Sequence, residues 1–134
     1  MKSLLLILLS SAGMYISLYF TLVYYSVIKS SARFMPRFCR LDQISCSVII
    51  HHKDARVLRA PNFVIGLAYY SLILFYVGNA PMPWLDMILT YASWLTVGLG
   101  IYLVYSLYFV VKVMCPLCLI SHAVNLVIAI VLSV

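Results

Sequence analysis

The chain of 134 residues is 66% hydrophobic and only 9% charged, whereas a soluble domain is typically about 25% charged. This composition excludes an ordinary soluble domain and predicts one integral membrane domain over residues 1–134. The net charge of +6 does not indicate nucleic-acid binding, because the basic residues gather between apolar stretches, where they suit a belt near lipid headgroups.

The first predicted element is a membrane helix over residues 3–28. No charged residue occurs in this stretch, and a helix needs about 20 apolar residues to cross a bilayer. Lys2 and the small residues around Gly13 also resemble a signal peptide. The apolar run continues well beyond Gly13, however, so a retained helix is the prediction and a cleaved signal is the alternative.

A long loop over residues 29–60 follows and holds seven of the nine basic residues. Its two cysteines, Cys39 and Cys46, are either a static disulfide that staples the loop or a thiol pair that exchanges with another pair. His51 and His52 are interpreted as part of a solvated stretch facing the headgroups.

Three further helices are predicted over residues 61–78, 85–111 and 115–134, giving an all-α four-helix membrane bundle. Pro61 is the candidate first residue of the second helix, and Gly and Pro mark the turn at 78–84. Because the chain crosses the membrane with each helix, the loop, the start of the second helix and the start of the fourth are expected at the same membrane face.

The fourth helix opens with Cys115-Pro116-Leu117-Cys118, a C-x-x-C motif. Pro116 suits the first helical position, with Cys115 as the cap. A thiol there meets the positive end of the helix dipole, which favours the reactive thiolate. A dithiol–disulfide redox pair is the favoured interpretation; a buried core pair and a metal site are the alternatives.

His122 and Asn125 continue the same helical face, because the spacing from Cys115 through Cys118 to Asn125 is 3, 4 and 3. Polar side chains in an apolar span are costly unless they are paired or functional. We expect His122 to hydrogen-bond a ligand carbonyl or to move a proton, whereas a hydrogen bond between helices is a good explanation for Asn125.

Asn62 and Gly66 stand in the first turns of the second helix. Asn62 is a candidate donor to a ligand oxygen, or a donor to the backbone of its own helix. Gly66 admits a flat ligand or a neighbouring helix, and helix packing is the more ordinary explanation. Two helix N-termini near the cysteines would stabilise a thiolate or an anionic oxygen.

Four helices, a loop with "C…ISCS", "PN-x-x-x-G" and "C-P-x-C" together resemble the vitamin K epoxide reductase family. The resemblance implies that Cys115 and Cys118 reduce a quinone, with Cys118 next to it. It implies that Cys39 and Cys46 are redox-active and relay electrons from a thioredoxin-like partner. Asn62 matches the quinone-binding asparagine of the family.

Two departures accompany the resemblance. His122 stands where the animal enzymes carry tyrosine, so the resemblance does not imply selectivity for vitamin K, and His52 stands where a hydroxyl residue is frequent. Many microbial members carry a fused thioredoxin-like domain, whereas this chain ends at Val134, so a separate protein partner is expected.

The sequence therefore predicts a multi-pass membrane oxidoreductase that makes disulfides in partner proteins and passes electrons to a quinone. The alternatives are a Cys/His metal-binding or transport protein and a structural subunit with inert cysteines. Eight basic residues, the seven of the loop and Lys112, stand on one side, against Lys2 on the other. This bias predicts a cysteine site facing the cytoplasm, whereas the resemblance implies the extracytoplasmic side.

Overall fold

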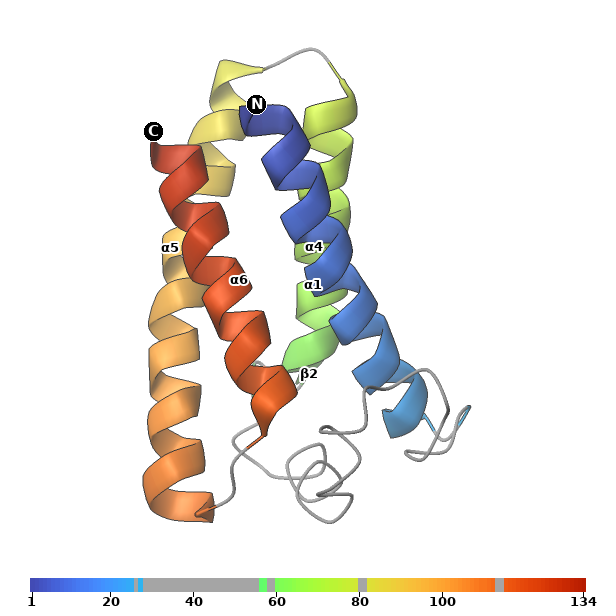
Figure 1. The fold of residues 1–134 in the computed structure, drawn as a ribbon, viewed down its shortest axis with the longest axis vertical. Coiled ribbons are helices and arrows are strands. Elements are labelled where there is room, and N and C mark those ends of the chain that lie inside the picture. The colour runs from blue at the N-terminus through green and yellow to red at the C-terminus, as the bar shows by residue number, and fades with distance from the viewer. Residues whose placement is uncertain (26, 28–55, 58–59, 80–81, 113–114) are drawn as a thin grey trace.

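A computed structural model describes residues 1–25, 27, 56–57, 60–79, 82–112 and 115–134. The helices are α1 (Lys2–Tyr24), α4 (Asn62–Gly78), α5 (Pro83–Ser106) with its continuation η2 (Leu107–Val111), and α6 (Pro116–Ser133). They stand side by side as an up-and-down bundle, with both termini at one end (Figure 1). Two short strands, β1 (Arg56–Val57) and β2 (Ala60–Pro61), pair antiparallel before α4. The prediction of an all-α four-helix bundle is confirmed.

Three of these helices are long and apolar enough to cross a membrane: α1, α5 with most of η2, and α6. At 17 residues, α4 is shorter, and a rise of 1.5 Å per residue leaves it slightly below the roughly 30 Å of bilayer hydrocarbon. The outer faces are apolar as well; Leu95 and Ile101 are 67% and 68% exposed. Such exposure suits lipid rather than water, so the chain is a membrane protein.

The helix bounds differ from the predicted ones in several places, and α5 begins at Pro83 instead of residue 85. α1 ends at Tyr24 instead of residue 28. Pro61 is the N-cap of α4 and not its first residue, because its ψ of 134° is extended. The helix therefore begins at Asn62. The last turn of the third helix widens into a π-helix, which Lys112 ends in the left-handed conformation with φ 54°. The start of α6 is as predicted, with Cys115 as the cap and Pro116 at the start of the helix.

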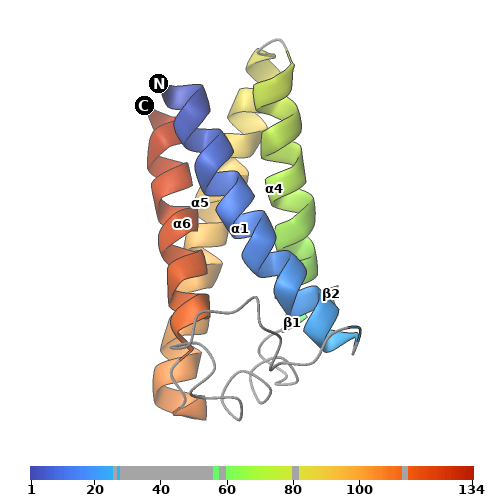
Figure 2. The same cartoon turned by 45° about the vertical axis from the view of Figure 1, so that its right-hand side comes forward.

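Close packing of α1 on α4 holds one side of the bundle together (Figure 2). Two glycines make the approach possible. The ring of Tyr70 lies against Gly13, and the side-chain oxygen of Ser17 would lie 2.9 Å from a Cβ atom at Gly66. The hydrophobic effect does not drive helices together within lipid. Small residues stabilise the contact instead, because they let the two backbones approach closely enough for van der Waals packing.

Hydrogen bonds between side chains connect the remaining helices. Tyr69 bonds Ser93 at 2.6 Å between α4 and α5, and Tyr70 donates to Asn125 Oδ1 at 2.6 Å between α4 and α6. Away from these, Tyr76 donates to Asp86 at 2.8 Å and Trp94 to Ser133 at 2.9 Å. Inside a membrane such pairs replace the partners that water would provide.

Candidate redox site

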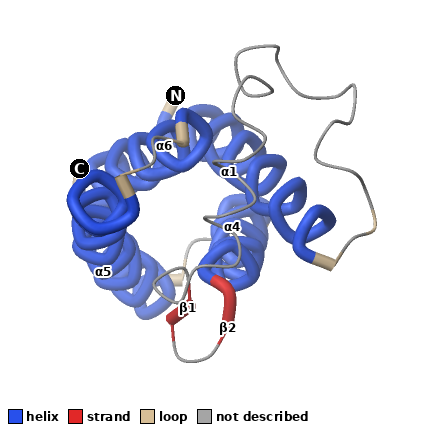
Figure 3. Tube along the Cα trace, turned by 90° about the horizontal axis from the view of Figure 1, so that it is seen from below, coloured by secondary structure: helices blue, strands red, loops and turns tan. Residues whose placement is uncertain are grey.

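One end of the bundle gathers the elements that the sequence placed at a common membrane face. The starts of α4 and α6 lie there, together with the ends of α1 and η2 (Figures 1 and 3). The strand pair β1–β2 also lies at this end (Figure 2) and includes the last residues of the predicted loop. Cys39 and Cys46, with His51 and His52, lie outside the described residues, so their predicted roles stay predictions.

Cys115 is completely buried where α6 begins. Its exposed fraction is 0%, and its carbonyl oxygen accepts the Leu119 N–H at 3.2 Å, which closes the first turn. Pro116 starts the helix with a preset φ. Cys118, one turn further, is only half-buried and packs against the same cluster. The motif therefore presents one fully buried cysteine and one partly exposed cysteine at the positive end of a helix.

An aromatic wall from α1 and α4 stands beside the cysteines. Phe20 and Phe63 stack with ring centres 6.2 Å apart and planes at 29°, and Tyr24 packs on Phe63 at 5.5 Å. Tyr19, Phe20 and Phe63 all belong to the cluster that contains Cys115. Stacked and tilted rings of this kind favour contact with a flat, apolar ligand. Nothing in the sequence pattern singles out Phe20 or Phe63, because an aromatic residue in an apolar span carries no distinguishing signal by itself.

His122 faces α5 and lies on Gly100. A Cβ atom at Gly100 would lie 2.7 Å from Nδ1 of His122. Nδ1 is fully buried and has no hydrogen-bond partner among the described residues. On α6 the ring stands one helical turn after Cys118. His122 is therefore close to the thiol chemistry and is held by the backbone of a neighbouring helix.

The residues predicted to share one face of α6 contact three different helices. The cysteines turn toward α1, His122 turns toward α5, and Asn125 accepts the hydrogen bond from Tyr70 of α4. The hydrogen bond between helices expected for Asn125 is thus present. These residues share a face of α6, but different neighbouring helices cover different parts of that face.

Asn62 and Gly66 lie near the start of α4, at the same end as the cysteines. Asn62 is the first residue of the helix and is half-buried. Gly66 faces Ser17 at close range, which agrees with the packing explanation. Contact of Asn62 or Gly66 with a ligand stays a prediction.

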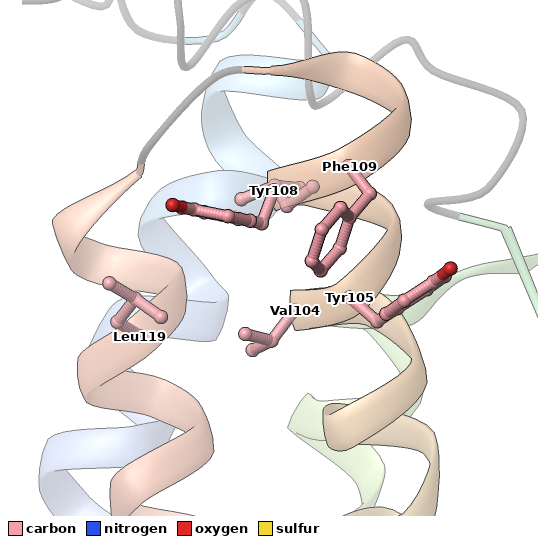
Figure 4. Close-up of a pocket in the computed structure, with 6 residues that line it drawn as sticks. Val104, Tyr105, Tyr108, Phe109 and Leu119 are labelled. Carbon is pink, nitrogen blue, oxygen red and sulfur yellow. The ribbon is translucent and has the colours of Figure 1, made fainter.

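A separate apolar hollow of about 210 Å³ opens between the end of α5 and the start of α6. Tyr108 and Phe109 border it from η2 and Leu119 faces it from α6 (Figure 4). Leu107 lines the hollow and also packs on the cluster of Cys115. Leu107 therefore contacts both the hollow and the cluster that contains Cys115.

The wide turns of η2 shape this hollow. Tyr105 and Phe109 lie with ring centres 4.7 Å apart, and Tyr108 meets Phe109 edge to face at 5.0 Å. π-helical turns are rare and are frequent at functional sites. Within the described residues, no three His, Cys, Asp or Glu side chains gather to hold a metal ion.

The sequence pattern that describes the vitamin K epoxide reductase family matches residues 4–133, which is almost the whole chain. The chain belongs to the vitamin K epoxide reductase family. Membership confirms the resemblance drawn from the motifs and makes the protein a membrane thiol oxidoreductase. The C-x-x-C motif of Cys115 and Cys118 lies within the matched residues.

Proposed function

We propose that this protein makes disulfide bonds in partner proteins and passes the electrons to a membrane quinone. The observation that carries the proposal is the position of Cys115 and Cys118 at a helix N-terminus, packed among aromatic rings of α1 and α4. Thiolate stabilisation and a flat apolar surface are the two properties that this reaction needs at one place.

The residues present fit a quinone. Tyr24 and Phe63 are half-buried rings, with Phe20 stacked on Phe63, and His122 offers a polar side chain one turn along α6 from Cys118. A bound quinone would supply the two-electron oxidising power that re-forms the disulfide between Cys115 and Cys118. Asn62 and Gly66, at the start of α4, are proposed to complete the quinone site.

The two cysteine pairs have different proposed roles. A thiolate of one pair attacks the disulfide of the other, so one disulfide breaks while another forms and two electrons move between the pairs. Cys39 and Cys46 exchange with the separate thioredoxin-like donor and then with the C-x-x-C pair. Cys118, the more accessible sulfur of its pair, is the one proposed to lie next to the quinone.

The activity test uses the purified, full-length protein in detergent with a dithiol donor and a soluble quinone. We expect quinone reduction that depends on the donor and that Cys118→Ala abolishes. Ile120→Ala is the matched control, because Ile120 lies on the same turns of α6 but is exposed toward lipid, and it should leave the rate unchanged. Activity that survives Cys118→Ala would contradict the proposal.

A further inference from the structure

The contact between His122 and Gly100 restricts what the histidine can do. A Cβ atom at Gly100 would lie 2.7 Å from Nδ1, 3.3 Å from Cγ and 3.5 Å from Cε1 of His122. Glycine carries a hydrogen in that direction. The Nδ1 edge of the ring therefore faces a C–H group of the α5 backbone at close range.

A C–H group is a favourable neighbour for Nδ1 only when Nδ1 is unprotonated. A neutral imidazole carries its proton on one nitrogen, and the other nitrogen is an acceptor. An unprotonated Nδ1 accepts a weak C–H···N contact from Gly100. A protonated Nδ1 would be a buried donor facing a hydrogen, with no acceptor among the described residues, which is the costly arrangement.

We infer that Gly100 fixes His122 as the neutral tautomer with its proton on Nε2, which makes His122 a permanent hydrogen-bond donor and not a proton relay. A relay takes up a proton at one ring nitrogen and releases one from the other. Nδ1 cannot take up a proton in this way, because it is buried against the backbone of α5. Nε2 is left to donate to a carbonyl oxygen of the ligand near Cys118.

The ligand in this inference rests on the proposed quinone function, but the tautomer does not. The inference predicts that His122 binds the oxidised quinone through one N–H group. The protons that accompany quinone reduction must then come through other groups. Gly100 acts as a positioning residue, since it touches the histidine and not the substrate.

The direct test is ¹⁵N NMR of the reduced, full-length protein with labelled histidine, in detergent and without quinone. The chain has three histidines, and His122→Gln identifies the signal of His122 by its loss. We expect Nδ1 unprotonated and Nε2 protonated throughout the neutral pH range. A protonated Nδ1, in either the other tautomer or the charged ring, would overturn the inference. This measurement needs no activity, so it stands or falls independently of the proposed function.

Two substitutions at His122 test the consequence for catalysis. The amide N–H₂ of glutamine reaches about as far as Nε2 and donates but does not titrate, whereas that of asparagine reaches only as far as Nδ1. We expect His122→Gln to keep kcat/KM for quinone within about threefold of wild type. His122→Asn should lose about tenfold, the upper value for one hydrogen bond. An equal loss in both variants would overturn the donor role.

Gly100→Ala tests the positioning role, with Gly98→Ala as the matched control. The methyl group at Gly100 would displace the ring, whereas Gly98 has nothing within 4 Å of a Cβ atom. We expect Gly100→Ala to shift the ¹⁵N signals of His122 and to raise KM for quinone about threefold to tenfold. Gly98→Ala should change neither quantity. Unchanged His122 signals in Gly100→Ala would overturn the inference.

Discussion

The ring of Tyr70 occupies the space beside Gly13 that any larger side chain would need. Tyr70 is 1% exposed, so its ring has no free volume into which it can withdraw. The same side chain donates its hydroxyl proton to Asn125 at 2.6 Å. One tyrosine of α4 thus sets the distance to α1 and the link to α6 at once.

Gly13→Ala is expected to destabilise the protein by roughly 1–3 kcal/mol, the usual cost of overpacking a core. The added methyl group would press on an enclosed ring rather than on the free end of a flexible side chain. Thermal unfolding in detergent measures the loss. Gly78→Ala is the control, because nothing lies within 4 Å of a Cβ atom there. Equal stability of the two variants would refute the packing role of Gly13.

Tyr70→Phe keeps the ring and removes the hydroxyl group, and with it the hydrogen bond to Asn125. Hydrogen bonds between membrane helices contribute about 0.6 kcal/mol on average, and up to about 1.7. We expect a loss of stability in that range. A double-mutant cycle with Asn125→Ala isolates the pair. A coupling energy near zero would mean that the hydroxyl and the amide contribute independently.

Cys118 is expected to react with a small maleimide before Cys115 in the reduced protein. Cys115 has an exposed fraction of 0%, whereas Cys118 is half-buried. Reaction of Cys115 needs local opening, and each 1.4 kcal/mol of opening slows it about tenfold. Peptide mass spectrometry after brief alkylation gives both rates, and denatured protein is the control in which they should become equal. Faster labelling of Cys115 would argue against this assignment of the accessible sulfur.

The charge bias predicts that the cysteine site faces the cytoplasm. Lys112 lies exposed at the end of the bundle where α6 begins, and Lys2 lies at the other end. An impermeant maleimide should therefore label Cys39 of the reduced protein only after cells are lysed. Labelling in intact cells would place the site outside, as the resemblance implies, and would defeat the charge argument.

Much of this architecture is predictable because it depends on local chemistry. Hydrophobic length and absence of charge predicted the four helices and the membrane, and Pro116 after Cys115 predicted the cap and the start of α6. The helix ends were harder to place. The extended ψ of Pro61 and the π-helical turn after Ser106 depend on neighbouring backbone, which composition does not report.

The sequence by itself determined the class of protein, the common end of the bundle at which α1 ends and α4 and α6 begin, and the residue types available for chemistry. Only the tertiary structure decided which neighbour each side chain meets: Gly66 meets Ser17, Asn125 meets Tyr70, and His122 meets Gly100. The physical reason is that spacing along one helix defines a face, whereas the rotation and crossing of the other helices decide what covers it. The role of His122 follows from that second kind of information, because the glycine that restricts it lies on another helix.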